Sequence, residues 1–398
     1  MKGLIQYSIG MINMAASMDV YKFSHIEPSV PDGQRGEGDL ADQSIPVARS
    51  GHRIVVTDGD LYSLGGYNPK YWDVENTEET YFPLFKELWQ FNFVSRKWRK
   101  LNTTGHMPLE LASHAAVRDN NKLLAYGGTG VPFGEASSND LHVCGLTSHK
   151  WQHFKCTGQH PEKKYGHAML LIGRYLYVCG GTTGFVYNMD VHRLSLDTLV
   201  WEKLSSDQES PSDPDGRYRH EMACFQHRLY IFGGGTAGEA YRFELIPTFC
   251  LTELAWENIS AVPDKRFGFP APRRCHSCCQ LNNDVYMCGG MDGVKILPDL
   301  WRFSLATHTW LKMSQDMVLP TYFHAADIAP NGCMYIFGGV TAIDNVRTSE
   351  IYRIWLKVPS LQEIAWNGLI GALPNTDNVD KQNLAELGVP AHFLDRIS

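Results

Sequence analysis

The sequence predicts an all-β protein built from six copies of one strand-rich unit and followed by a short α-helical tail. Three features recur together along the chain. Glycine pairs follow apolar runs such as "DLYSLGG" and "RLYIFGG", at residues 65–66, 127–128, 180–181, 233–234, 289–290 and 338–339. About a dozen residues before each pair, a histidine closes a tetrad, at 49–52, 111–114, 164–167, 217–220, 273–276 and 321–324. A tryptophan usually comes after the pair, as at Trp98, Trp151, Trp201, Trp256 and Trp310.

Each repeat predicts four strands in order. The histidine tetrad precedes the first strand, and the glycine pair ends the second, where the backbone turns tightly and a Cβ is not tolerated. An alternating run such as "ELWQFNF" gives the third strand, and the tryptophan gives the fourth, as an apolar body that can pack between neighbouring units. This combination resembles the kelch motif over about residues 20–356. The resemblance implies a six-bladed kelch β-propeller in which every repeat is one four-stranded blade.

The sixth repeat lacks a fourth strand, because "EIYRIWL" is followed by a helical pattern instead of a tryptophan run. The segment "VYKFSHIEP" at 20–28 precedes the first tetrad as "WRKLN" precedes the second. We therefore predict that residues 20–26 pair into the last blade and close the ring, which removes two exposed sheet edges. The predicted propeller spans 20–357, between a flexible extension at 1–19 and a helical tail at 358–398. Two long connections, 28–47 and 68–85, are predicted surface loops.

Composition and charge argue against several function classes. The net charge of −7 is spread without long runs, which argues against nucleic-acid binding. No segment approaches the roughly 18 apolar residues of a membrane span, and polar residues at 6, 8 and 13 interrupt the one run that resembles a secretory signal. The ten cysteines include a cluster at 275–279 with no second ligand pair, so we expect neither a metal nor a cofactor. Free thiols indicate a reducing compartment, the cytoplasm, with the nucleus as a second location.

The tail at 358–398 changes to helical periodicity. Ser360 and Glu363 form a capping box that opens a first helix, a second is expected at about 379–387, and a third begins at Pro390. About forty residues are marginal for an independent core, so the apolar stripes of these helices need another surface to cover them. They pack either on the side of the propeller or on a partner protein.

The tail residues resemble two docking motifs. "SLQEIAWNGL" resembles the elongin BC-box, with Ala365 in place of the usual cysteine, and the candidate elongin-binding residues are Leu361, Ile364, Ala365 and Leu369. "VPAHFLDRI" resembles the cullin-2 box, and its candidate residues are Val389, Pro390, Phe393 and Ile397. With the repeats, and with stretches such as "RYRHEMACFQHRLYIFGGG", the chain resembles the kelch domain-containing protein 10 family of substrate receptors for cullin-2–elongin B/C ubiquitin ligases.

That resemblance implies a non-catalytic subunit that binds C-terminal degrons, which are chain ends finishing in a small residue such as Gly or Ala. It also suggests a link to a kinase or phosphatase of oxidative-stress signalling. Neither implication follows from composition or spacing.

The tetrads should ring one face of the propeller, around the central axis. A terminal carboxylate favours a planar bidentate donor, which arginine supplies. The candidate cations are Arg49, Lys164, Arg217, Arg219, Arg273 and Arg274. The candidate pocket walls are Tyr165, Tyr218, Tyr322 and Phe323, and Ser277 matches the position of a carboxylate-binding serine in a related receptor. Related receptors also use arginines after the preceding glycine pair, but "GGGTAGEAY" at 233–241 has none, so the clamp must be built differently.

Two other function classes compete with the receptor. A kelch scaffold would bind actin or a signalling enzyme without degradation, and it would have no need of an elongin-like helix. An enzyme is the third class, since some kelch propellers carry a copper-radical site. The chain shows neither that constellation of Tyr, His and Cys nor a G-x-S-x-G motif. Fold alone does not give function, so the receptor interpretation depends on the tail and on the family resemblance.

Overall fold

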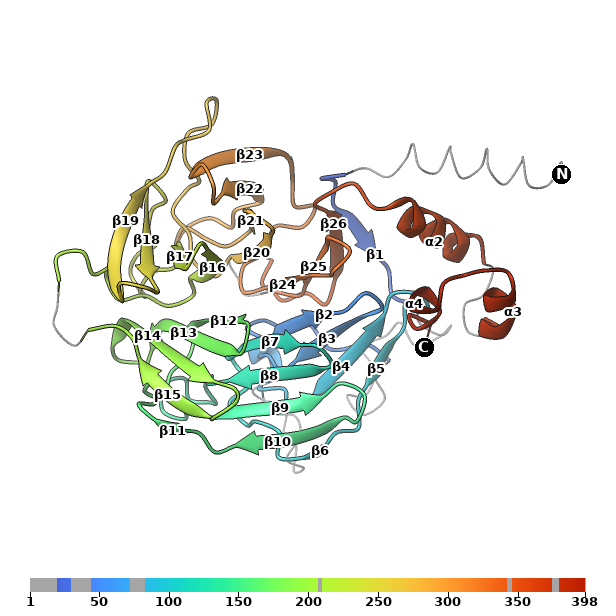
Figure 1. The fold of residues 1–398 in the computed structure, drawn as a ribbon, viewed down its shortest axis with the longest axis horizontal. Coiled ribbons are helices and arrows are strands. Elements are labelled where there is room, and N and C mark those ends of the chain that lie inside the picture. Colours follow the sequence, from blue (N-terminus) through green and yellow to red (C-terminus); the bar gives the residue numbers. More distant parts are fainter. Residues whose placement is uncertain are drawn as a thin grey trace.

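The described residues fold as a ring of six sheets around a central axis, with helices at one edge (Figure 1). The structure is a computed structural model and describes residues 20–29, 44–71, 83–206, 210–341, 346–373 and 379–397. The six-bladed propeller predicted from the repeats is confirmed. The predicted extension at 1–19, and most of the two predicted loops at 28–47 and 68–85, lie outside the described residues.

Each blade runs from an innermost strand at the axis to an outermost strand at the rim. The innermost strands are β2 (Arg53–Val56), β7 (Ala115–Asp119), β12 (Ala168–Ile172), β16 (Glu221–Phe225), β20 (Ser277–Leu281) and β24 (Ala325–Ile328). The second strands are β3 (Asp60–Leu64), β8 (Lys122–Tyr126), β13 (Tyr175–Thr182), β17 (Arg228–Phe232), β21 (Asp284–Cys288) and β25 (Cys333–Phe337). The third strands are β4 (Leu88–Asn92), β9 (Leu141–Gly145), β14 (Tyr187–Ser195), β18 (Leu245–Cys250), β22 (Asp299–Ser304) and β26 (Ile351–Trp355). The outermost strands are β5 (Trp98–Lys100), β10 (Lys150–Phe154), β15 (Val200–Lys203), β19 (Ala255–Ser260), β23 (Thr309–Asp316) and β1 (Ser24–Ile26).

The N-terminal segment completes the sixth blade. β1 pairs antiparallel with β26, and Ile26 lies opposite Ile351. Phe23 and Ile26 are buried in the clusters on either side of this blade. The pairing that the sequence predicted for residues 20–26 is therefore present at Ser24–Ile26. Two further edge strands, β6 (Thr104–Gly105) and β11 (Thr157–Gly158), add in parallel to β10 and β15 and were not predicted.

The glycine pairs and the tetrad histidines interlock between blades. The first glycine of each pair lies against the histidine of the next blade, and the second lies against the histidine of its own blade. A Cβ on Gly127 would lie 2.6 Å from Cε1 of His167, and one on Gly128 would lie 2.8 Å from Cβ of His114. All six tetrad histidines are buried, and burial lowers the pKa of each, to about 3 for His114 and His220. The tetrad histidines are therefore neutral and pack against the glycine pairs. This packing explains why the histidines and the glycine pairs recur together in the sequence.

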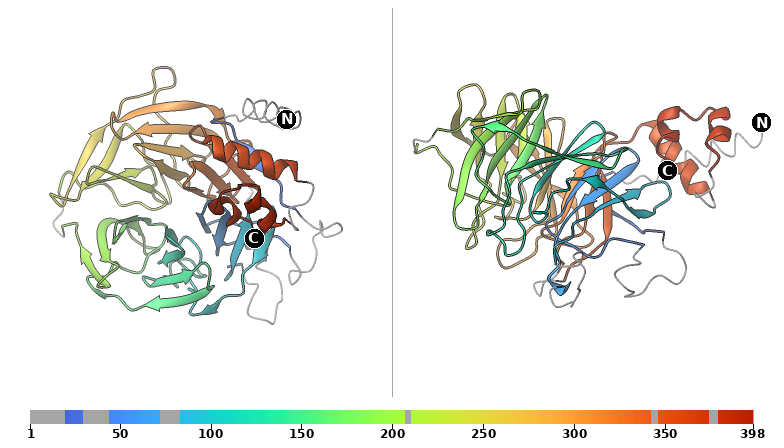
Figure 2. Two further views of the ribbon diagram at one scale, coloured as in Figure 1. Left: turned by 45° about the vertical axis from the view of Figure 1, so that its right-hand side comes forward. Right: turned by 90° about the horizontal axis from the view of Figure 1, so that it is seen from below.

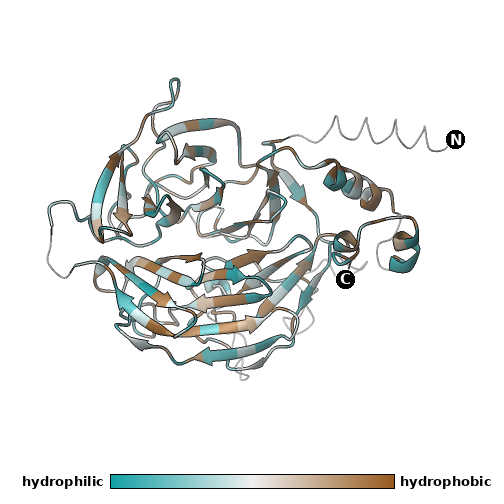
Figure 3. Ribbon diagram, in the orientation of Figure 1, coloured by the Kyte–Doolittle hydropathy of each residue, from teal (hydrophilic) through white to brown (hydrophobic). Residues whose placement is uncertain are grey.

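The tryptophans fill the space between neighbouring blades, as predicted. The ring of Trp98 in blade one lies 5.1 Å from Phe337 in blade six, and Trp201 in blade three lies 5.1 Å from Tyr126 in blade two. The second strands are the most deeply buried, whereas an outermost strand such as β10 is mostly hydrophilic (Figure 3). Each inter-blade space is thus a separate apolar layer, and together these layers form the core.

The tail forms α2 (Leu361–Ala372), α3 (Lys381–Glu386) and α4 (Ala391–Leu394), which stand together at the edge of the propeller (Figure 2). The predicted cap is present, because Ser360 Oγ accepts a hydrogen bond from Glu363 N at 3.2 Å. Part of the apolar stripes packs on the propeller, as the first alternative predicts, and docking of the rest on a partner stays a prediction. None of the helices in the described ranges is long and apolar enough to cross a membrane.

The tail rests on turns of blades one and six. Val94, in the turn after β4, joins Trp366 and Phe393 in a small apolar cluster. A buried ion pair joins Arg396 to Glu363 at 2.6 Å, and Asn331 in the turn after β24 donates to Glu363 at 2.9 Å. These turns lie at the strand ends opposite the glycine pairs. The tail therefore lies at the edge of the propeller, against turns on the side opposite the tetrads.

Candidate functional site

The six tetrads meet around the axis in a closed ring of backbone hydrogen bonds. The third residue of every tetrad has a left-handed φ between 56° and 66°. Each of these residues donates its N–H to the carbonyl of its counterpart in the previous blade, at 2.7 to 3.1 Å. The residues of the ring are Gly51, Ser113, Gly166, Arg219, Cys275 and Phe323. A closed ring of hydrogen-bonded main chain therefore surrounds the axis on this face.

A cavity of about 200 Å³ opens on the ring. Its lining includes four of the residues predicted from the sequence: Tyr165, Tyr218, Arg219 and Phe323. It also includes residues that the sequence did not single out, mainly Ser50, Tyr67, Ser113, Phe133 and Arg347. Aromatic rings form most of the wall and two guanidinium groups supply the charge, which suits a small anionic group carried on an apolar stem.

Among the described residues, no carboxylate forms an ion pair with Arg219. Its guanidinium lies 4.4 Å over the ring of Phe323, and its buried Nε has no hydrogen-bond partner within the described residues. Burial lowers the pKa of Arg219. Glu221 interacts electrostatically with Arg219, but its ion pair is with Arg53, at 3.2 Å. A half-buried guanidinium in this state favours an incoming carboxylate.

Arg347 reaches the same cavity from blade six. Its Nε donates to Ser50 Oγ at 3.0 Å, and its guanidinium lies 5.4 Å from the centre of the Tyr67 ring. Arg347 lies next to Val340 in a short bridge on the chain returning from the last glycine pair. The corresponding positions in the other five blades hold Leu84, Ser137, Tyr187, Ala240 and Ile296. A comparison of these positions between repeats could have identified Arg347, since it is the charged member of the set.

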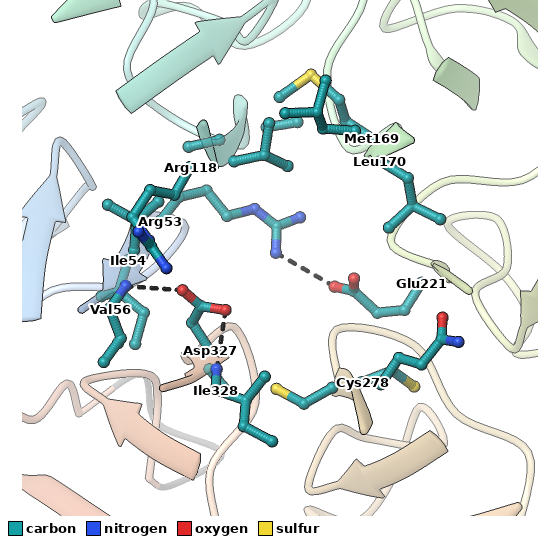
Figure 4. A pocket seen from close by; sticks show the side chains of 18 of the residues that line it. Arg53, Ile54, Val56, Arg118, Met169, Leu170, Glu221, Cys278, Asp327 and Ile328 are labelled. Carbon is teal, nitrogen blue, oxygen red and sulfur yellow. Dashed lines mark hydrogen bonds and ion pairs between the residues drawn. The ribbon is translucent and has the colours of Figure 1, made fainter. Parts of the chain in front are cut away.

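The innermost strands enclose a second cavity, of about 330 Å³, in the central channel (Figure 4). The Arg53–Glu221 ion pair crosses it from blade one to blade four, and Arg53 Nε also donates to His114 O at 3.1 Å. Asp327 accepts hydrogen bonds from Val56 N at 2.7 Å and Ile328 N at 2.8 Å, and burial raises its pKa to about 6. Among the described residues, neither Glu221 nor Asp327 forms an ion pair with Arg219.

The first tetrad position does not reach the cavity, contrary to the expectation from the sequence. Three of its arginines donate to the carbonyl of the first glycine in their own blade: Arg49 to Gly65 at 3.0 Å, Arg217 to Gly233 at 3.3 Å and Arg273 to Gly289 at 3.1 Å. Arg49 and Arg273 also pair with Glu87 and Asp299, and Lys164 donates to Asn188 at 3.0 Å. All four side chains are buried, so they hold the blades together and are inaccessible to a ligand.

Three other predicted residues lie beside the cavity without lining it. Arg274 donates to the carbonyls of Thr236 and Glu239 and so holds the loop after the blade-four glycine pair. Ser277 is buried, and its hydroxyl donates to His324 O at 3.4 Å. Tyr322 is buried against Phe323, with ring centres 5.2 Å apart. Of the three, Ser277 is the clearest departure from the expected role, because its buried hydroxyl donates to a carbonyl of the neighbouring blade.

In the tail, the two predicted motifs differ in accessibility. Leu361 is 81% exposed, and Ile364 and Ala365 are partly exposed, whereas Leu369 packs partly against the tail's own cluster. In the cullin-2-box-like segment, Pro390 is exposed and Val389 is partly exposed. Phe393 and Ile397, by contrast, are buried in the tail's own cluster. These two side chains hold α4 to Trp366 and Val94, and their contact with a partner stays a prediction.

All ten cysteines are free thiols, and no group of three metal-binding side chains is found within the described ranges. Burial raises the pKa of Cys275 to about 12, and that of Cys278 also rises. These thiols act as small apolar side chains in the ring and the channel.

Comparison with known proteins agrees with the repeat pattern. The family model described as the KLHDC2/KLHL20/DRC7 Kelch-repeats domain matches residues 38–234 and 212–370. The chain is 46% identical to the kelch domain-containing protein 10 of Rattus norvegicus over 363 residues, covering 91% of this chain and 88% of that protein. It is 46% identical to the Homo sapiens protein of that name, covering 88% of this chain and 80% of that protein.

More distant relatives extend the comparison. The kelch domain-containing protein 10 homolog of Drosophila melanogaster is 38% identical, covering 89% of this chain and 62% of that protein. The kelch domain-containing protein 2 of Bos taurus is 26% identical, covering 75% of this chain and 77% of that protein. The fold, the repeats and these identities together show that the chain belongs to the kelch domain-containing protein 10 family of kelch-repeat β-propellers.

Proposed function

We propose that this chain is the non-catalytic substrate-recognition subunit of a cullin-2–elongin B/C ubiquitin ligase, and that its axial pocket binds the C-terminal end of a substrate. The observation that carries the pocket assignment is the Arg219 guanidinium, which is half buried and has no ion-pair partner within the described residues. A terminal carboxylate supplies the missing anion. Arg347, on the other side of the same cavity, supplies a second planar donor.

The size and walls of the pocket support a preference for small terminal residues. Its volume of about 200 Å³ is below the roughly 300–1,000 Å³ of pockets that hold drug-sized ligands. The rings of Tyr165 and Tyr218 stand 6.5 Å apart at nearly right angles, and Phe323 lies under Arg219. A chain end finishing in Gly or Ala fits between these rings, whereas a bulky terminal side chain would have to displace one of them.

The tail supports the second half of the proposal. Leu361 and Ala365 lie four residues apart on a side of α2 that is exposed or partly exposed, whereas Glu363 and Trp366 are buried and Leu369 packs partly against the tail's own cluster. The tail lies at the edge of the propeller, on the side opposite the pocket, so a ligase bound there would not obstruct a substrate. The free thiols fit the cytoplasm, with the nucleus as a second location. A stress-pathway kinase or phosphatase is a further proposed partner.

The pocket is tested by titrating a peptide that ends in Gly with the wild-type protein and with Arg219→Gln. Loss of a charge-assisted hydrogen bond costs about 1.5–3 kcal/mol, so we expect Kd to rise by about 10- to 150-fold. Arg274→Gln is the matched control, because Arg274 lies one blade away and its donors point to backbone carbonyls of the 236–239 loop. Equal affinity for the wild type and Arg219→Gln would refute the pocket assignment.

The tail is tested by capture of elongin C and cullin-2. Leu361→Asp places a charge in the most exposed position of the motif, and we expect it to abolish capture of both proteins. Val318→Asp is the control, since Val318 is 64% exposed and belongs to the propeller. If wild-type protein captures neither partner, the scaffold function is favoured, a function that the burial of Phe393 and Ile397 within the tail also permits.

A further inference from the structure

Two loops beside the pocket meet in one apolar patch. They follow the glycine pairs of blades two and three, and short bridges from Thr129 to Ala112 and from Thr182 to Tyr165 place both on the face of the tetrads. The loops touch through glycines, since a Cβ on Gly134 would lie 2.9 Å from Cα of Gly184. Each of these two glycines is followed or preceded directly by a phenylalanine. We call the patch formed by Phe133, Phe185 and Val186 the apolar rim.

The apolar rim is unusually exposed and is continuous with the pocket. Phe185 is 83% exposed, Val186 is 59% exposed and Phe133 is 47% exposed. Phe133 also lines the pocket, and its ring lies 4.9 Å from that of Tyr67 on the pocket wall. An exposed group of large apolar side chains next to a binding cavity is typical of an interaction surface.

The rim is held in place by hydrogen bonds. Thr182 Oγ1 donates to Val186 O at 2.8 Å and accepts from Gly184 N at 3.0 Å. Thr183 N donates to Val186 O at 3.1 Å. The loop is therefore a tight turn that presents Phe185 outward in a defined position. A preorganised apolar contact loses little conformational entropy on binding, which favours its use in recognition.

The pocket is too small to contain more than a chain end, so the preceding residues of a bound peptide must cross its edge. On the side of blades two and three, the edge is the apolar rim. An extended chain advances about 3.3 Å per residue, so residues a few positions before the terminus lie over this edge.

We propose that the apolar rim is a second subsite, which binds apolar side chains of the substrate upstream of its terminal residues. The inference rests on the proposed function of the pocket, and it adds a substrate class: chain ends in which a small terminal residue follows an apolar segment. Phe185 and Val186 then act as specificity-determining residues, while Arg219 and Arg347 hold the carboxylate.

The test uses two twelve-residue peptides with a Gly end that differ at the third to sixth positions before the terminal residue. One carries leucines there and the other serines. Partial burial of such apolar side chains should make wild-type protein bind the leucine peptide about five- to tenfold more tightly than the serine peptide. In Phe185→Ser/Val186→Ser the preference should fall below twofold, with the affinity for the serine peptide unchanged. Val294→Ser is the control, because Val294 is 72% exposed on the corresponding loop of blade five.

The outcomes separate the two proposals. A wild-type protein without preference, or a preference that survives in Phe185→Ser/Val186→Ser, overturns the rim subsite. Amidated versions of both peptides report on the pocket alone: if they bind as tightly as the acids, carboxylate recognition fails whatever the rim does. If neither acid peptide binds to wild-type protein, both proposals fall together.

Discussion

Removal of residues 1–26 should destabilise the propeller sharply, because it takes away the strand that closes the ring. β1 pairs with β26 at three positions, and its loss would leave β26 as an exposed sheet edge. Phe23 is 6% exposed and Ile26 is 8% exposed, and they belong to the apolar clusters on the two sides of blade six. Their removal would open both inter-blade layers at once.

The size of the effect follows from this burial. Removing a large buried apolar side chain costs about 2–3 kcal/mol, so the two residues together contribute about 5 kcal/mol to the free energy of unfolding. The entropy of unfolding is about 2.1 cal/mol/K per residue, or about 0.8 kcal/mol/K for a chain of this size. The midpoint temperature should therefore fall by about 6 °C.

Thermal unfolding followed by circular dichroism measures this shift. The matched control is the variant that lacks only residues 1–19, which retains β1, Phe23 and Ile26. We expect the two variants to differ by the full shift. If they melt at the same temperature, β1 does not close the ring, and the interpretation of Ser24–Ile26 as the outermost strand of blade six is refuted.

Three further predictions follow from the packing. Acidification should lower the melting temperature, because burial holds the folded-state pKa of the tetrad histidines below the unfolded value of about 6.5. Their contribution to the free energy of unfolding is complete above pH 6.5 and is lost as the pH falls toward about 3. At pH 5 the loss amounts to about 2 kcal/mol per histidine. A flat stability profile between pH 7 and 5 would contradict this. Glu363→Ala leaves Arg396 buried without its anion and should raise amide hydrogen exchange in α2–α4 while sparing the blades; unchanged exchange in the tail would show that the pair does not hold it. Gly65→Ala should cost at least about 2 kcal/mol, since its φ is +66° and its Cβ would lie 2.6 Å from Leu111 O, whereas Gly371→Ala, with open space in α2, should be neutral or stabilising by up to about 1 kcal/mol. Equal effects of the two substitutions on chemical denaturation would exclude the clash.

The blades could be predicted because their features are local and repeated. Each glycine pair requires space that a Cβ would fill, and each tetrad histidine occupies that space from the neighbouring blade, so the two must recur at one spacing. The strands β6 and β11 could not be predicted, because they are two-residue pairings that carry no apolar alternation. Their existence depends on the neighbouring outermost strand and not on their own sequence.

The pocket could be predicted only in part, because residues two positions apart in one tetrad lie in different environments. Arg217 and Arg219 are two residues apart, yet Arg217 is buried in its blade and Arg219 faces the axis. The difference comes from the left-handed backbone of the third position, which the sequence indicates only where that position is glycine. The tetrads therefore indicated this face of the propeller, and Arg219 was among the candidate cations, but the sequence could not distinguish it from the buried arginines of the first tetrad position.

The tail shows the same limit of pattern-based prediction. In the sequence, apolar residues at helical spacing form the same pattern whether they are buried within the protein or contact a partner. Phe393 and Ile397 match a partner-binding motif but pack on Trp366 and Val94, whereas Leu361 matches one and is exposed. Distinguishing the two cases requires the turn after β4, whose contact with the tail is distant in sequence.

The affinity of one peptide in two chemical forms tests the central claim most directly. A peptide ending in Gly is titrated into wild-type protein once with a free carboxylate and once with an amidated end. Recognition of the carboxylate by Arg219 and Arg347 predicts that amidation raises Kd by at least about tenfold. Equal binding of the acid and the amide would contradict the claim that this pocket reads the end of a chain.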